Sequence, residues 1–202
     1  MTSRWRPTPA QALSLLLGLG LFGTGEAMLV AANLGNSPWT VFAQGLAGRV
    51  GLSVGVMTNL IGVVVLVLWL PLRQRPGLGT VANIAIVGTS LDIALTFLPH
   101  FSALPPRLAM TVGGIAVVAI GSGFYLGCGL GPGPRDGLMT GLSRVTGWPL
   151  GVTRGLVEVS VLVVGMLLGG VAGVGTLMFA LLVGPGVHLA VRLRSRVPDS
   201  DL

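Results

Sequence analysis

The stretch Gly131–Leu142, GPGPRDGLMTGL, decides the fold. It places the adjacent charged residues Arg135 and Asp136 in a chain that otherwise carries few charges. It also matches Gly35–Leu46, GNSPWTVFAQGL, which lies 96 positions earlier (131 − 35). Proline suits the first turn of a helix, and glycine permits the tight entry before it. The stretch therefore predicts a short helix, and its match predicts an internally duplicated chain.

The composition indicates a membrane protein. Of 202 residues, 52% are hydrophobic and only 9% are charged, and the mean hydropathy is +0.88. An average soluble domain is about 25% charged, so a soluble fold could not cover its surface with this chain. Apolar runs of about 20 residues, which recur here, span a bilayer as helices. The expected surroundings are therefore a lipid bilayer.

Several functional classes are excluded by composition. The net charge of +6 comes from arginines at span ends and in loops, which form no basic face for nucleic acid. The chain has no lysine and one cysteine, Cys128, so lysine chemistry and cysteine-based metal clusters are excluded. Its two histidines fall at opposite predicted faces, and no Ser–His–acid set or HExxH motif occurs. We expect no enzyme activity, no cofactor and no metal site.

Apolar runs separated by prolines and arginines predict an all-α polytopic membrane protein with six transmembrane helices. Each predicted three-span unit contains one short interrupting helix. The predicted segments are a cytoplasmic N-terminus 1–11, repeat 1 at 12–98 with short helix 37–49, repeat 2 at 108–191 with short helix 134–146, and a cytoplasmic basic tail 192–202. The predicted spans are Ala12–Asn33, Ser53–Leu72, Gly79–Leu98, Leu108–Cys128, Pro149–Leu168 and Gly173–Val191.

The internal repeat keeps the offset of 96 along both units. It relates glycines, prolines and the pairs Gly79–Thr80 and Gly175–Thr176, each of which does a specific backbone task. An odd number of spans per unit makes the second copy enter the membrane from the opposite side, as in many secondary transporters. The alternative is that duplication only makes a stable bundle. The short-helix motif residues are Gly35, Pro38, Trp39, Gly131, Gly133 and Pro134.

Arginine placement predicts the orientation. With both termini inside, the outer segments carry only Arg49 and Arg107, as the positive-inside rule favours. We therefore expect a multi-pass membrane protein with both termini cytoplasmic. The inner segments would carry Arg4, Arg6, Arg73, Arg75, Arg135, Arg144, Arg192, Arg194 and Arg196.

Three stretches carry a resemblance to a known family. GPGPRDGLMTGL, LGNSPWTVFAQGLAGRVGLSVG and PLRQRPGLGT together resemble the YczE-like bacterial membrane proteins of the YczE/YyaS/YitT group. The resemblance implies a multi-span inner-membrane protein, in a family without an established activity. That family commonly has Asp, and often His, in the first short helix, where this chain has Thr40 and Ala43.

Charged residues within or beside the spans are the candidate functional residues. A charge at the bilayer centre costs at least ~2.5–3.5 kcal/mol on insertion scales, so each needs a partner or a water-filled cavity, or must be neutral. The candidates for a solute or ion pathway are Glu26, Asp92, Arg135, Asp136, Arg154, Glu158 and His188.

Depth divides these candidates into two sets. At a rise of about 1.5 Å per residue, Glu26 and Asp92 fall towards the outer side, without a cationic partner at that depth. We expect them to form an outer acidic cluster near Asn59, Trp39 and Thr40, while the others fall in the inner half.

The inner charges have several predicted pairings. Arg154 and Glu158 are spaced to pair on one helix face, either as a gate or merely to neutralise each other for insertion. Arg135 could pair with Glu158, and Asp136 with Arg154; the alternative is a solvated loop pair.

The leading functional hypothesis is passage of a small solute or ion, with proton or cation coupling at Glu26 and Asp92. The alternative is a non-transporting scaffold or regulator of a partner protein, in which the charges only specify packing. The expected protein partners are another copy of the chain or a different membrane protein.

Overall fold

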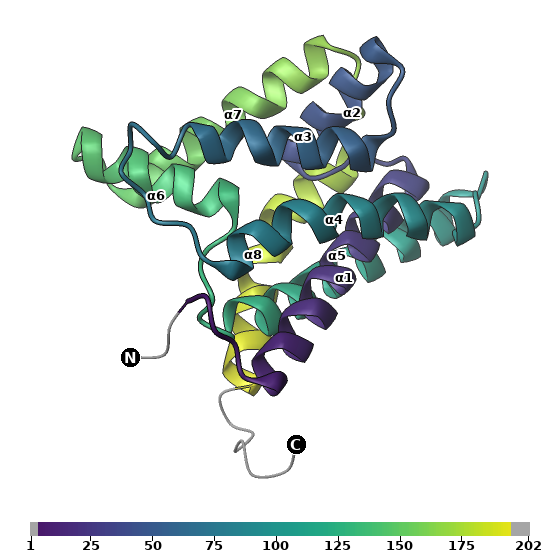
Figure 1. Ribbon diagram of the computed structural model, residues 1–202. Helices are drawn as coiled ribbons and strands as arrows, with labels where there is room; N and C mark the ends of the chain where they lie inside the picture. The colour runs from purple at the N-terminus through teal and green to yellow at the C-terminus, as the bar shows by residue number, and fades with distance from the viewer. Residues whose placement is uncertain (1–3, 195–202) are drawn as a thin grey trace.

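The computed structural model describes residues 4–194, which fold into eight α-helices (Figure 1). The predicted all-α class is confirmed, and α2 and α6 occupy the predicted places of the short helices. Residues 1–3 of the expected N-terminus and 195–202 of the expected tail lie outside the described residues. The helices are α1 (Pro9–Ala32), α2 (Pro38–Val50), α3 (Val54–Val67), α4 (Leu78–Phe97), α5 (Leu104–Leu126), α6 (Pro134–Thr146), α7 (Leu150–Leu167) and α8 (Val174–Arg194).

Five of the described helices, α1, α4, α5, α7 and α8, are long and apolar enough to cross a bilayer. Helices α2 and α3 pass the same test only together, and they are bent by 111° at the break between them. They therefore form a sixth, broken span or a re-entrant loop. The second expected span is shorter than predicted, because α3 ends at Val67 and the chain turns before Pro71, which cannot continue a helix.

The centre of the fold is the crossing of α1 and α5. Glycines on both helices bring the two backbones into contact: a Cβ added at Gly18 would lie 2.8 Å from the carbonyl oxygen of Gly121. At the other crossing point, a Cβ at Gly25 would lie 2.7 Å from the carbonyl oxygen of Gly114. Small residues allow this close packing between membrane helices, where dispersion rather than water exclusion drives association. Helix α4 packs on α1 and helix α8 packs on α5, whereas α2, α3, α6 and α7 pack mainly against one another and α4 (Figure 1).

The constant offset seen in the sequence extends to the helices. Helices α6, α7 and α8 begin 96 residues after α2, α3 and α4 (134 − 38, 150 − 54 and 174 − 78). The backbone hydrogen bonds between the two halves are reciprocal: Gly79 donates to the Leu130 carbonyl at 2.9 Å, and Gly175 donates to the Leu34 carbonyl at 2.8 Å. Adding 96 to the number of Gly79 gives Gly175, and subtracting 96 from that of Leu130 gives Leu34. The two bonds are therefore equivalent.

The entries to the two short helices use the same backbone device. Gly35 has φ 119° and Gly131 has φ 113°, values that only glycine adopts readily. Both are also closely packed against the other half: a Cβ at Gly35 would lie 2.5 Å from the Gly173 nitrogen, and one at Gly131 would lie 3.1 Å from the Gly77 nitrogen. These glycines direct both short helices inward, towards each other.

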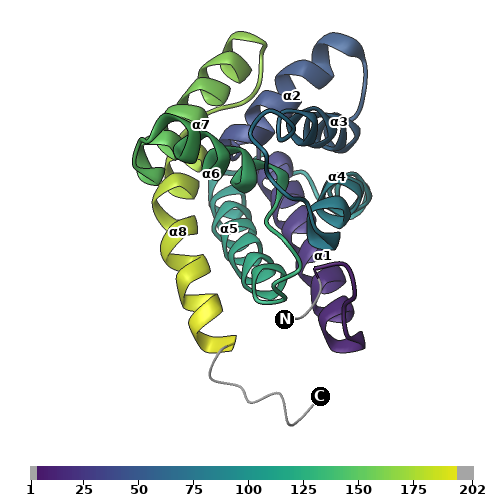
Figure 2. The ribbon, with the colours of Figure 1, turned by 60° about the vertical axis from the view of Figure 1, so that its left-hand side comes forward.

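The last two helices are the least enclosed. Helix α4 packs against both α1 and α3, whereas α8 packs mainly against α5 and α7 packs mainly against α2. Figure 2 shows α8 running down one side of the molecule, away from α7. The two halves therefore repeat in sequence and helix order but differ in how their outer helices are packed.

Candidate functional site

A cavity of about 690 Å³ lies where the N-terminal ends of α2 and α6 meet. Both ends contribute to its wall, through Ser37 and Pro38 on one side and Gly133 and Pro134 on the other. Helices α1, α3, α4, α5, α7 and α8 supply the rest of the wall. Every predicted pathway residue except Asp92 lines it: Glu26, Arg135, Asp136, Arg154, Glu158 and His188.

Glu26 is the buried acid of this cavity, with 1% of its surface exposed. Its Oε2 accepts hydrogen bonds from the Ser37 hydroxyl at 2.9 Å and the Thr40 hydroxyl at 2.8 Å. Its Oε1 has no hydrogen-bond partner among the described residues. A buried carboxylate oxygen without a partner is costly, so a proton, a water or an ion at this atom would stabilise the site.

The start of α2 is built around this carboxylate. Ser37 is the residue before the helix, where a hydroxyl usually caps a free backbone N–H. Here the side chain makes no capping bond and donates to Glu26 instead. The positive end of the α2 dipole, together with two hydroxyl donors, stabilises a negative charge at this position.

Arg135 and Trp39 join the first turns of the two short helices. The Arg135 guanidinium carbon lies 5.2 Å from the centroid of the Trp39 ring, within range of a cation–π interaction. Arg135 is also close enough to Glu26 for a direct electrostatic attraction. Trp39 is buried, and its indole Nε1 has no hydrogen-bond partner among the described residues. Two residues that line the cavity, Glu26 and Trp39, thus each have a buried polar atom without a partner among the described residues.

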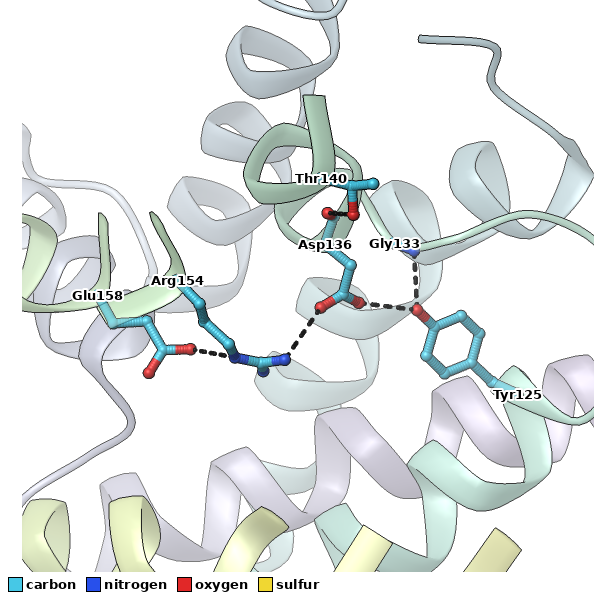
Figure 3. Close-up of polar contacts among 6 residues, drawn as sticks. All are labelled: Tyr125, Gly133, Asp136, Thr140, Arg154 and Glu158. Atoms are coloured by element: carbon cyan, nitrogen blue, oxygen red, sulfur yellow. Dashed lines mark hydrogen bonds and ion pairs between the residues drawn. The ribbon is translucent and has the colours of Figure 1, made fainter. Parts of the chain in front are cut away.

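A chain of polar contacts continues from α6 to α7 (Figure 3). Arg154 donates from Nε to Glu158 Oε1 at 3.0 Å, and its Nη1 lies 4.0 Å from Asp136 Oδ1. The structure therefore gives the pairing of Asp136 with Arg154 that the sequence analysis considered, along with the i, i+4 pair. Asp136 is engaged with other side chains and is not part of a solvated loop pair.

Tyr125 is a site residue that the sequence analysis did not identify. Its hydroxyl accepts from the backbone nitrogen of Gly133 at 2.8 Å and donates to Asp136 Oδ2 at 3.2 Å (Figure 3). It thereby connects the end of α5 to the start of α6. The available signal was its uniqueness, because it is the only tyrosine in the chain and lies at the end of an apolar span.

Exposure is graded along the cavity. The side chains of Arg154, Asp136 and Glu158 are 57%, 40% and 33% exposed, whereas Glu26 is 1% exposed. The first three therefore lie at the mouth and Glu26 lies at the deep end. His188 on α8 is exposed and lines the same cavity.

The predicted outer acidic cluster of Glu26 and Asp92 does not form. Asp92 accepts from the backbone nitrogens of Gly55 at 2.8 Å and Val56 at 3.2 Å, and also from the Ser53 hydroxyl. It caps the start of α3, because the free N–H groups of a first helical turn attract a carboxylate. Glu26 instead turns to α2 and has a cation, Arg135, within reach. Thr40 and Trp39 lie near Glu26, as expected. Asn59 instead donates to the Thr89 hydroxyl of α4 and is not among the residues that line the cavity.

Comparisons with known proteins place the chain among bacterial membrane proteins. It is 38% identical over 197 residues to an uncharacterized protein of Haemophilus influenzae, covering 98% of this chain and 90% of the relative. It is 32% identical over 182 residues to an uncharacterized membrane protein, YczE, of Bacillus subtilis, covering 90% and 82%. It is 26% identical over 184 residues to the uncharacterized protein YyaS of that organism, covering 89% and 92%.

A family model described as "Family of unknown function (DUF6198)" matches residues 10–192. No solved structure matches the chain.

Proposed function

Because the chain belongs to the Family of unknown function (DUF6198), we propose its function from the site itself: the protein passes a small polar solute or ion across the membrane. The resemblance to the YczE-like group is confirmed by its relatives, and the chain is a multi-pass membrane protein. The observation that carries the proposal is the cavity of about 690 Å³ with the buried, half-unsatisfied carboxylate of Glu26 at its deep end.

The charge balance of the cavity supports coupling to a cation or proton. Arg135, Asp136, Arg154 and Glu158 sum to zero when all four are ionised, and all line the cavity. Glu26 adds one negative charge that this set does not compensate. An uncompensated charge inside a membrane is costly, so one bound cation or proton would stabilise the site.

The helix ends support a polar solute. Two helix N-termini facing one cavity supply free N–H groups and partial positive charge, which suit the negative group of a solute. The hydroxyls, carboxylates and indole nitrogen supply the remaining polar contacts. The cavity volume lies within the roughly 300–1,000 Å³ range typical of small-molecule pockets. The favoured solute is therefore small and polar. If the solute has no positive charge of its own, a cation or a proton accompanies it.

We also propose that the two halves are inverted repeats in a cytoplasmic membrane, with both termini inside. The constant offset of 96 and the reciprocal hydrogen bonds support a two-fold relation, and the arginine distribution supports the orientation. A Cys128→Ala background with one new cysteine would test the orientation. We expect Thr2→Cys to resist a membrane-impermeant maleimide in intact cells and His100→Cys to react; the opposite pattern would invert the topology.

The functional test begins with a ligand screen on purified protein. A panel of alkali cations, ammonium, amino acids and small carboxylates would be screened for a rise in apparent melting temperature, which reports binding to the folded state. We expect a hit that Glu26→Gln abolishes. The matched control is Asp92→Asn, because Asp92 is an acid outside the cavity. The hit should then cross proteoliposome membranes containing the wild type, and binding without flux would reject passage.

The second candidate, a non-transporting scaffold, is favoured by one observation. Arg154, Glu158 and Asp136 already interact with one another, as charges that only specify packing would. This function predicts that Arg154→Ala lowers stability and leaves every solute flux unchanged. A reconstituted flux that falls in Arg154→Ala, at unchanged melting temperature, would exclude it.

A further inference from the structure

The outer helices of the two halves are packed differently at equivalent positions. In the first half α3 packs along α4, and a Cβ added at Gly55 would lie 2.0 Å from the Gly88 carbonyl oxygen. The equivalent residues in the second half, 96 positions later, are Gly151 on α7 and Gly184 on α8. A Cβ added at either of these would meet no atom within 4 Å. One half therefore has a closed helix pair, and the other half has the same pair open.

Both helix pairs contribute to the wall of the cavity. On the closed side, α3 and α4 contribute Thr58 and Asn83 to the wall, and their backbones are in contact at Gly55 and Gly88. On the open side, Arg154 and Gly184 line the cavity itself, and the Arg154 side chain is 57% exposed. The backbones of α3 and α4 are thus in contact beside the cavity, whereas α7 and α8 make no such contact at the equivalent glycines.

We propose that the protein alternates between this conformation and one in which α7 closes on α8 and α3 separates from α4. The inference rests on the proposed passage function and identifies its two gates. In the second conformation Gly151 contacts Gly184 as Gly55 now contacts Gly88, and His188 takes the place at the start of α7 that Asp92 has at the start of α3. Rocking of one repeat against the other gives such an exchange when the repeats are inverted.

The residues on the open side are compatible with closure. Where the closed pair has Gly62 opposite Ile84, at 3.1 Å from a built Cβ, the open pair has Glu158 and Ala180 at the equivalent positions. The closed pair has the small residue on its first helix and the large residue on its second, and the open pair has the reverse. The combined side-chain volume is therefore similar in the two pairs. Gly155, which replaces Asn59 of the closed pair, has nothing within 4 Å of a built Cβ and adds no obstacle.

The charges at the open gate can also be buried together. Closure would remove Arg154, Glu158 and Asp136 from solvent, and each already has its partner in this set. With Arg135 included, the set has no net charge, which lowers the cost of taking it out of water. Pro185 lies beside Gly184 inside α8 and removes one helical hydrogen bond, so the helix can bend at this point.

Cysteine cross-linking in native membranes tests the alternation without knowledge of the solute. In a Cys128→Ala background, Asn59→Cys with Thr89→Cys reports the closed gate, since these side chains hydrogen-bond at 3.3 Å. Val152→Cys with His188→Cys reports closure of the gate between α7 and α8, because the equivalent Val56 nitrogen lies 3.2 Å from Asp92 Oδ2 in the closed pair. We expect a short bis-maleimide to link each pair within single molecules. Linking 152 to 188 should prevent linking of 59 to 89 in a four-cysteine variant.

A blocking variant provides the matched control. Gly184→Leu has open space in this structure and should leave the melting temperature unchanged, but its side chain would fill the gate that α7 must close. We expect it to abolish the 152–188 link and retain the 59–89 link. Gly48→Leu on α2, which also has nothing within 4 Å of a built Cβ, should retain both.

The outcomes separate this inference from the proposed function. A 152–188 link that is absent in the unblocked protein, that forms only between molecules, or that leaves the 59–89 link unaffected would overturn the alternation, although solute flux could still occur. If the links are mutually exclusive and Gly184→Leu removes one of them, the alternation stands. A lack of flux for every solute would then reject only the passage function. Electron–electron distance measurements on spin labels at the same pairs would confirm two exchanging populations.

Discussion

Helices α2 and α6 have nearly the same backbone and different chemistry. Each has 13 residues, starts with a proline and ends at a glycine, Gly51 with φ 71° or Gly147 with φ 72°. Yet the start of α2 is buried and holds its hydroxyls against Glu26, whereas the start of α6 carries Arg135 and Asp136 at the cavity. The comparison teaches that the two matching segments share the residues that shape the backbone and differ in the residues that carry charge.

The largest expected effect comes from giving α2 the acid that α6 carries. Thr40→Asp places a carboxylate where α6 has Asp136, in direct contact with Glu26, whose bond to Thr40 is 2.8 Å. Two adjacent carboxylates cannot both be ionised in a buried site, so we expect a loss of about 3–5 kcal/mol in unfolding free energy at pH 8. Denaturation in detergent would measure it.

The loss in Thr40→Asp should shrink at pH 5, because protonation of one carboxyl removes the repulsion. The control is Thr140→Asp on α6, since Thr140 is exposed and bonds only the Asp136 carbonyl oxygen of its own helix. Equal losses in the two variants would show that Glu26 is not the cause.

Ser37 tests the other half of the Glu26 site. Ser37→Ala removes a buried 2.9 Å hydrogen bond to the carboxylate and leaves the α6 equivalent, Gly133, unchanged. Hydrogen bonds to charged groups contribute roughly 1.5–3 kcal/mol, and we expect a loss of that size in unfolding free energy. Ser160→Ala, which removes an exposed bond to the Leu156 carbonyl of the same helix, should cost much less.

The two short helices differ in side-chain size at the position of Gly137 on α6. Its equivalent in α2 is Val41, and its own Cβ position lies 1.9 Å from the Trp69 ring. That ring is 2% exposed and is held by a 2.9 Å bond from Nε1 to the Pro134 carbonyl. Gly137→Ala should therefore cost about 1–3 kcal/mol through overpacking. Gly48→Ala on α2 meets no atom and should not lower the melting temperature, because alanine is the better helix former; equal losses would contradict the packing explanation.

Much of the fold could be predicted from the sequence because glycines and prolines mark backbone events. Gly131 and Pro134 predict where α6 begins, and the offset of 96 predicts where α2 begins. The helix order followed from apolar runs, whose length relates directly to the thickness of a bilayer. The bend of 111° between α2 and α3 was not predictable, because it depends on how the short helix packs between other helices.

The sequence predicted most of the residues of the site but not which of them lie close together. Depth along each helix placed Glu26 beside Asp92, but depth says nothing about the direction in which a side chain points. Asp92 is taken up by the free N–H groups of α3, and Glu26 turns to the hydroxyls of α2. Tyr125 contacts Asp136 only because the loop between α5 and α6 brings Gly133 back over the end of α5, a tertiary feature that the apolar pattern does not encode.

The smallest expected effect is at the mouth of the cavity, in the charge pair that α6 has and α2 lacks. Arg154 is 57% exposed and lies 4.0 Å from Asp136. Its Nε also bonds Glu158 at 3.0 Å. Exposed ion pairs contribute about 0.2–1 kcal/mol and helical i, i+4 pairs about 0.3–0.5, so Arg154→Gln should lower the unfolding free energy by about 0.5–1.5 kcal/mol. Salt should weaken the pair further, so the difference from wild type should fall as ionic strength rises.

If Arg154→Gln costs several kcal/mol at every salt concentration, the pair is buried for much of the time. That result would indicate that the gate between α7 and α8 is closed for most of the time. The outer helices of the two halves would then be packed more alike than they are in this structure.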